Sequence, residues 1–345
     1  MTIRPAAPAD GPEMLRLMES HPAKGNLNIL YTRRPDAYKS YLTECADVEI
    51  TLCTGNDGRL LAQVACLPRR LYVNRESRTV GYVTGLHKAE GAFVNIMKLL
   101  EAGRVRSSAK QFFCSILDDN KPVFDLFAKR GLIHTICNYT TYLIHPKAVK
   151  PIRHNLLFRP AQAGDGERLL RFYREEGSRY SYFPVFSTMN DFPGLSMTNF
   201  FILEDSAGIA AAGALWDQSA FKQYVALGYK GVYKLAALCS PLLSAWGYPP
   251  LPAPNTASHF AYISFLLYRK NNPELERVML GEIAAAGGSF DFLVIGAAAD
   301  DSLGMYLKNI KSYKFNSKLC ILDYDGSGSL AAICETTPRF ECGLL

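Results

Sequence analysis

The sequence predicts an α/β protein made of two tandem domains of the same kind, each with a mixed β-sheet. Three observations support this. The 345 residues exceed one ordinary core, because domains average about 150 residues. The residues that open the chain recur at an offset of 155. The strands and helices expected after each copy then follow a similar order, which indicates a duplicated fold.

Composition limits the classes of protein to consider. Hydrophobic residues make up 48% and charged residues 20%, as in a compact globular protein. The net charge of +6 is dispersed, whereas nucleic-acid binders gather Lys and Arg on one face. No uninterrupted apolar stretch is long enough to span a bilayer, and the nine cysteines form no CxxC pair. We therefore expect a cytoplasmic protein with no metal site and with neither a nucleic acid nor a membrane as partner.

The repeat is the most informative feature of the chain. Each copy predicts a short strand, a polar turn that caps a helix, and an amphipathic helix. The identical residues are Arg4, Pro5, Ala6, Asp10, Gly11, Leu15 and Arg16, which recur as Arg159, Pro160, Ala161, Asp165, Gly166, Leu170 and Arg171.

Alternating and apolar runs extend the first copy into a complete series of elements. Asn56-Asp57-Gly58 predicts the turn of a hairpin between its first two long strands. The series comprises a helix at 35–45, strands at 48–55, 60–74 and 79–87, a helix at 93–102, a strand at 112–117, a helix at 122–130 and a strand at 136–144.

The second copy repeats this series around an insertion at about 230–258, which has a helical half and a Pro-rich half. Its strands are expected at 200–205, 209–216, 223–229, 260–267, 290–297 and 317–324, and its helices at 273–287 and 302–311. We expect domains at 1–147 and 155–326 and a tail at 327–345, with a separate sheet in each domain. The insertion and the apolar chain end RFECGLL are expected to narrow a substrate cleft to a small or apolar acceptor.

Two motifs carry a resemblance to a known family. The opening IRPAxxxD and the segment CSILDDNKPVFDLFAKRGL at 114–132 resemble the GNAT N-acetyltransferase superfamily, with Asn120, Leu126-Phe127 and Gly131-Leu132 at motif positions. The resemblance implies transfer of an acyl group from acetyl-CoA or another acyl-CoA to the amine of a small molecule or peptide. It also implies a slot for pantetheine between two splayed strands, which in the second half end near Leu267 and Gly296.

The resemblance also implies cofactor-binding positions, although neither half keeps the glycine-rich phosphate loop of the family. The loop regions are HKAEGAFVNIMKLL at 87–100 and YRKNNPELERVML at 268–280. The run RKNN at 269–272 can instead be a solvated turn with no role in binding the cofactor. The candidate residues are Phe265, Leu266, Leu267, Arg269, Lys270, Asn271 and Asn272 in the second half, and His87, Lys88 and Gly91 in the first.

The resemblance implies a catalytic tyrosine on the last helix that protonates the leaving thiolate. The first half has Phe127 there, which cannot donate a proton, whereas the second has Tyr306. Asp217 is the candidate base, with Glu90 and His259 as alternatives, and no motif supports any of the three. Tyr306 can instead pack through its ring, and Asp217 can simply form a turn. We therefore expect the second half to be the active one, and the alternative is a non-catalytic GNAT-shaped binding or regulatory module.

Overall fold

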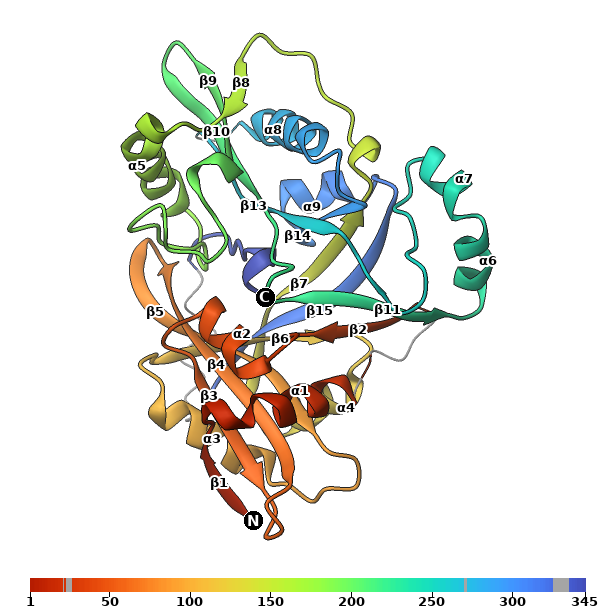
Figure 1. The fold of residues 1–345 in the computed structure, drawn as a ribbon. Helices are drawn as coiled ribbons and strands as arrows, with labels where there is room; N and C mark the ends of the chain where they lie inside the picture. The colour runs from red at the N-terminus through yellow and green to blue at the C-terminus, as the bar shows by residue number, and fades with distance from the viewer. Residues whose placement is uncertain (21, 23–26, 270–271, 325–334) are drawn as a thin grey trace.

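The computed structural model describes residues 1–20, 22, 27–269, 272–324 and 335–345, and it is a mixed α/β structure. Figure 1 shows the first half in red to yellow and the second half in green to blue. The elements of the first half are β1 (Thr2–Pro5), α1 (Gly11–Glu19), β2 (Leu27–Thr32), α2 (Ala37–Glu44), β3 (Glu49–Thr54), β4 (Leu60–Val73), β5 (Glu76–Lys88), α3 (Ile96–Arg106), β6 (Gln111–Leu117), α4 (Lys121–Lys129) and β7 (Ile133–Ile144).

The second half follows the same order with two departures: an irregular stretch stands in place of β2 and the second helix, and an additional strand precedes the insertion. Its elements are β8 (Leu157–Pro160), α5 (Gly166–Gly177), β9 (Phe200–Asp205), β10 (Gly208–Trp216), β11 (Gln223–Tyr229), α6 (Val232–Leu238), α7 (Ser240–Ala245), β12 (Thr256–Ala257), β13 (Phe260–Tyr268), α8 (Pro273–Ala286), β14 (Phe292–Ala298), α9 (Ser302–Leu307) and β15 (Ser312–Leu322).

The expectation of a separate sheet in each half is wrong. The strands form one sheet of twelve, in the order β1-β3-β4-β5-β6-β15-β7-β14-β13-β10-β9-β8. The halves exchange their last strands, since β15 of the second half pairs with β6 and β7 of the first pairs with β14. Each of the ranges 1–147 and 155–326 needs a strand of the other to complete its part of the sheet. Two domains with these bounds therefore remain a proposal.

Helices cover both faces of the sheet in each half. In the first half α1 and α2 pack on one face and α3 and α4 on the other, and β4 supplies Ala65 and Leu67 to one core and Val64 and Cys66 to the other. This alternation is the period of two of a strand covered on both faces. In the second half α5 covers one face, and α8 and α9 cover the other.

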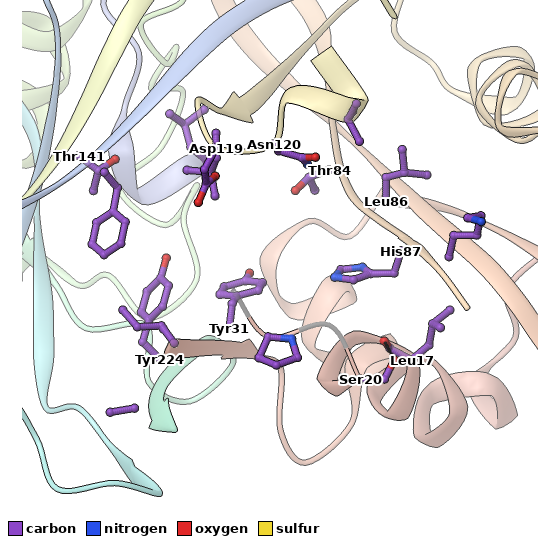
Figure 2. Close-up of a pocket in the computed structure, with 18 of the residues that line it drawn as sticks. Leu17, Ser20, Tyr31, Thr84, Leu86, His87, Asp119, Asn120, Thr141 and Tyr224 are labelled. Carbon is purple, nitrogen blue, oxygen red and sulfur yellow. Dashed lines mark hydrogen bonds between the residues drawn. The ribbon is translucent and has the colours of Figure 1, made fainter. Parts of the chain in front are cut away.

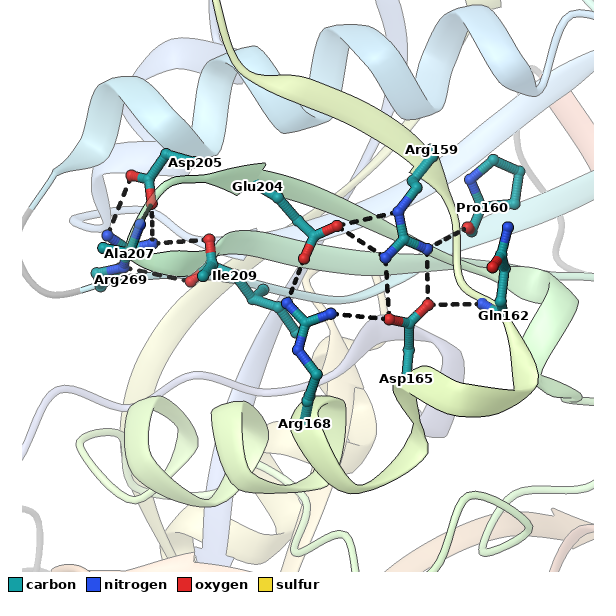
Figure 3. A network of polar contacts seen from close by, with 11 residues as sticks. Arg159, Pro160, Gln162, Asp165, Arg168, Glu204, Asp205, Ala207, Ile209 and Arg269 are labelled. Carbon is teal, nitrogen blue, oxygen red and sulfur yellow. Dashed lines mark hydrogen bonds and ion pairs between the residues drawn. The ribbon is translucent and has the colours of Figure 1, made fainter.

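The repeated residues make the same contacts twice, which explains why they recur. Arg4 bonds both carboxylate oxygens of Asp10 at 2.8 and 2.7 Å, and Arg159 bonds those of Asp165 at 2.6 and 2.9 Å. Each Asp also accepts the N–H of the residue three positions before it. Figure 3 shows the second network, in which the Arg159 guanidinium holds the pKa of Asp165 below its usual value. The pair fastens the first strand of each half to the turn that starts the helix.

Two differences from the predicted elements matter for function. Strand β2 was not predicted, and strand β11 does not join the main sheet. These two strands pair with each other across the halves, and β12 completes a second sheet of three strands. The pairing brings Tyr31 opposite Tyr224 and forms one wall of the cleft described below.

Candidate functional site

In each half a pair of parallel strands starts side by side and then separates. Strands β5 and β6 pair from Val80 to Val83, and β5 continues to Lys88 without β6 beside it. Strands β13 and β14 pair from Phe260 to Tyr262, and β13 continues to Tyr268. Each half therefore contains a V-shaped opening, as the sequence predicted.

A β-bulge lies at the same place in both openings. The register of β5 against β4 shifts at Gly85-Leu86, and that of β13 against β10 shifts at Phe265-Leu266. Gly85 has φ of 63° and Phe265 has φ of 55°, a left-handed conformation that is rare for a phenylalanine. A bulge changes the direction of the backbone groups next to it. The two bulges are thus equivalent positions in the two halves.

The opening of the second half is filled by the chain's own C-terminal segment. Glu341 accepts a hydrogen bond from the backbone N–H of Phe265 at 2.6 Å, and Tyr139 donates to the carbonyl of Phe340 at 3.2 Å. The cavity left between this segment, β13 and β14 measures only about 20 Å³. The apolar chain end therefore docks on the protein, as expected, but it occupies the slot that was expected to hold pantetheine.

The carboxyl group of Glu341 gives the docked segment a pH dependence. Burial raises its pKa from 4.5 to about 6, although the N–H groups of Phe265 and Gly343 favour the carboxylate. Since the pKa is raised in the folded state, this contribution to stability is complete below the unfolded pKa of 4.5 and is lost as the pH rises through about 6.

Glu341→Gln tests this linkage. As the pH rises from 4.5 through about 6, ionisation of Glu341 should lower the free energy of unfolding of the unmodified chain by about 2 kcal/mol. The glutamine cannot ionise, so the free energy of unfolding of the variant should not show this decrease with pH. Urea unfolding of both proteins at pH values on either side of the window measures the difference. Parallel pH profiles would contradict the prediction.

The opening of the first half leads into a large cleft of about 1490 Å³. This volume contradicts the expectation that the insertion and the chain end narrow the cleft to a small or apolar acceptor. Figure 2 shows side chains of α1, β5, the turn after β6 and the three-stranded sheet facing one space. The residues labelled there include Leu17, Ser20, Tyr31, Thr84, Leu86, His87, Asp119, Asn120, Thr141 and Tyr224.

One end of the cleft carries basic side chains. His87, Lys88 and Gly91 line it, together with Arg16 and Arg59, and the chain there leads to the N-terminus of α3. The Lys88 ammonium donates to the carbonyl of Ala92 at 2.8 Å, which folds the loop back on itself. Gly91 has φ of 71°, and a Cβ at this position would meet nothing within 4 Å. The structure thus brings the three predicted residues of the first half together on one surface.

The other end of the cleft is aromatic and is built mainly by the second half. It contains Tyr224, Tyr229 and Tyr313, the run Pro249–Pro252 of the insertion, and Tyr31 of the first half. The hydroxyl of Tyr229 donates to the carbonyl of Pro252 at 2.6 Å, and burial raises the pKa of Tyr229 to about 12. These tyrosines therefore remain protonated at neutral pH.

A buried charge cluster supports the bulge of β5 from behind. Gly85 has no side chain, and a Cβ there would come within 2.1 Å of the Tyr41 hydroxyl. The guanidinium of Arg33 lies 3.8 Å from the centre of the Tyr41 ring and donates to Glu44 at 2.6 Å. Glu44 also pairs with Lys222 of the second half at 2.7 Å. The cluster therefore ties the two halves together next to the cleft.

The predicted residues of the second half lie in structural contacts instead of one open site. Asp217 is exposed and accepts the N–H of Ser219 at 2.8 Å, as a turn residue does. The ring of Tyr306 packs at the edge of a core, 5.2 Å below the Arg277 guanidinium. Leu266 and Leu267 are buried in the cores.

The basic turn after β13 is also occupied by internal contacts. The Arg269 guanidinium pairs with Asp205 at 3.0 Å and donates to the carbonyl of Ile209, as Figure 3 shows. It also donates to the carbonyl of Gly208 in the same hairpin. Asn272 caps α8 by accepting the N–H of Glu274 at 3.1 Å. Lys270 and Asn271 lie outside the described residues.

Comparison with solved structures identifies the fold. A probable N-acyltransferase from Enterococcus faecalis matches over 93% of this chain and 71% of its own, with a TM-score of 0.52 and 12% identity. Saccharomyces cerevisiae N-myristoyltransferase with bound myristoyl-CoA matches over 93% and 82%, with a TM-score of 0.55 and 8% identity. The chain has the GNAT fold. A GCN5-related N-acetyltransferase from Anabaena variabilis matches over 92% and 72%, with a TM-score of 0.53 and 8% identity. Neither a family model nor a curated sequence matches the chain.

Within this GNAT fold, sequence reasoning missed which half keeps an open slot. The slot of the second half was expected from β13 and β14 alone, but the chain end fills it, with Glu341 bound to Phe265 from 76 residues further along the chain. The motif around Asn120 was the available signal for the first half, since Asn120 and the neighbouring Asp119 line the cleft. No helix in the described ranges is long and apolar enough to cross a membrane.

Proposed function

We propose that the chain is an acyl-CoA-dependent N-acyltransferase whose site is the cleft of the first half. This differs from the expectation that the second half is the active one. The observation that carries the proposal is the pair of equivalent bulges. In the second half the bulge N–H of Phe265 binds a carboxylate oxygen, so the geometry suits an oxyanion, while the bulge at Gly85 lies beside the large cleft.

The proposed reaction is the attack of an amine on the thioester that acyl-CoA supplies. Backbone N–H groups at the bulge of β5 would stabilise the oxyanion that develops on the carbonyl. Lys88 and Arg59, with the N-terminus of α3, give the basic end its attraction for phosphates. The aromatic end of the cleft leaves room for the amine acceptor. Acetyl-CoA is the simplest donor, and the cleft volume also suits longer acyl chains.

His87 is the candidate proton acceptor. Its Nδ1 lies 2.9 Å from the carbonyl oxygen of Gly85, so in the neutral ring Nδ1 carries the proton and Nε2 carries the lone pair. Figure 2 shows the ring within the cleft, near the bulge. Deprotonation of the attacking amine is therefore assigned to Nε2 of His87. Phe127 also lines the cleft and cannot protonate the leaving thiolate, which would then leave as the anion.

Acyl-CoA should raise the melting temperature of the protein, because a ligand that binds only the folded state stabilises it. Titration with acetyl-CoA and with longer acyl-CoAs measures the shift. Leu117 is 43% exposed and lines the cleft at the end of β6, so Leu117→Trp should fill the opening and reduce the affinity about tenfold or more. The variant's own melting temperature without ligand is the control.

Absence of a shift at millimolar ligand would favour the non-catalytic GNAT-shaped module. A shift that Leu117→Trp leaves unchanged would place the site elsewhere and would remove the first half from the proposal.

A further inference from the structure

The insertion carries an exposed apolar surface that the proposed reaction does not use. Helices α6 and α7 stand at the edge of the molecule, away from the twelve-stranded sheet (Figure 1). The helix α6 buries none of its residues, and α7 buries only Ser240. Large apolar side chains on these helices and just after them are 66 to 77% exposed: Val232, Leu235, Leu238, Leu242 and Trp246. We call these five residues the insertion patch.

Contiguous exposed apolar residues in a folded chain indicate a surface that another body covers. The helices are nonetheless held in place, because Ser240 Oγ accepts the N–H of Leu251 at 2.9 Å and the ring of Tyr233 lies 5.8 Å from that of Tyr313. Lys311 donates to the carbonyl of Trp246 at 2.8 Å. The insertion patch is therefore a defined part of the fold with its apolar side chains directed outward.

The insertion itself carries basic residues and no acidic ones. No acidic residue occurs in the sequence between Asp217 and Glu274. Exposed Lys230 precedes α6 and exposed Lys234 lies on it, and Lys311 contacts the end of α7. Exposed Lys147 adds a further charge, since its neighbour Ala148 lies against Gly247. The basic rim therefore consists of Lys147, Lys230, Lys234 and Lys311.

We propose that the insertion patch and its lysine rim dock the protein on the surface of an anionic lipid bilayer. Leucine and tryptophan beside lysine, with no carboxylate among them, is the composition of helices that lie in a membrane interface. Lysine is depleted in protein–protein interfaces, where arginine is the enriched cation, so a lipid surface fits the rim better than a second protein does. The proposal replaces our expectation of no membrane partner, and it does not depend on the proposed acyltransferase activity.

The test uses the full chain with vesicles of phosphatidylcholine alone or mixed with phosphatidylglycerol. Trp216 is fully buried and Trp246 is 70% exposed, and they are the only two tryptophans. Mixed vesicles should therefore shift the emission of Trp246 to the blue, and Trp246→Phe should remove that shift. Sedimentation with the vesicles gives the partition coefficient independently.

Two sets of variants separate the apolar and charged contributions. Leu235→Ser with Leu238→Ser and Leu242→Ser should lower the partition coefficient about tenfold or more. Lys230→Glu with Lys234→Glu should lower it by a similar factor, and added salt should weaken binding of the unmodified chain. The control is Val105→Ser, which changes a 69% exposed side chain on α3 and should leave partitioning unchanged.

Three results would overturn the proposal. One is an absence of binding to mixed vesicles, and another is binding that the leucine and lysine variants do not weaken. The third is a concentration-dependent dimer that the leucine variants dissolve while no vesicle binding is seen, which would assign the insertion patch to a second copy of the chain.

Discussion

Replacing His87 by alanine should lower the turnover number of acyl transfer about a hundredfold or more. A positioned general base contributes typically 10² to 10⁴ to the rate, and His87 is the imidazole that lies beside the bulge of β5 in the cleft. Its side chain does not hold the thioester, so the melting-temperature shift caused by acyl-CoA should persist.

The matched control lies in the second half. Tyr306→Phe removes only a hydroxyl from a ring that packs against Arg277 and an apolar core, outside the lining of the cleft. We expect its turnover to equal that of the unmodified chain. Loss of turnover in Tyr306→Phe together with full turnover in His87→Ala would return the site to the second half.

Glu44→Gln should destabilise the fold by about 3 to 5 kcal/mol, because it leaves buried cations without their counter-ion. Glu44 is paired with Arg33, Arg69 and Lys222, and all four side chains are at most 8% exposed. Burial opposes ionisation of the carboxyl group, but the three cations outweigh it and hold its pKa well below the usual value. This contribution to stability is present above the unfolded pKa and is lost as the pH falls towards the lowered one.

Urea unfolding at neutral pH measures the loss. Glu76→Gln is the control, since Glu76 pairs with Arg78 at the surface, where both side chains are largely exposed and such pairs contribute about 1 kcal/mol or less. Equal small effects in the two variants would show that the cluster around Glu44 is not essential to the fold. Because Lys222 joins the two halves through this cluster, Glu44→Gln should also weaken the affinity for acyl-CoA.

The elements of the sheet were predictable from local patterns, and their partners were not. The runs at 200–205 and 223–229 formed strands as predicted, because alternation and β-branched or aromatic content are properties of short segments. Nothing in the run around Cys320 indicates that β15 pairs with β6 of the other half. An apolar strand buried on both faces fits many neighbours, and its partner is chosen by the packing of the whole sheet.

The candidate site likewise has a part that local sequence patterns predict and a part that only the tertiary structure shows. His87, Lys88 and Gly91 are candidates from the sequence because they lie at the end of a predicted strand and directly after it, where the family resemblance implies a phosphate loop. The sequence favours the second half as the active one because it contains Tyr306, and a single residue at a motif position is a local feature. That Glu341 binds the N–H of Phe265 depends on a tail that returns across the molecule, and no local pattern reports such a contact.

The sequence by itself determined that the chain contains one α/β fold pattern twice. The pairs Arg4–Asp10 and Arg159–Asp165 are contacts between residues close in sequence, so a local pattern can show them. Only the tertiary structure decided which of the two slots stays open. The two bulges are equivalent in their backbone, so the outcome depends on where the chain end packs and on how β2 and β11 meet across the halves. Both are contacts between segments far apart in the sequence, where the free energy of packing depends on all neighbours together.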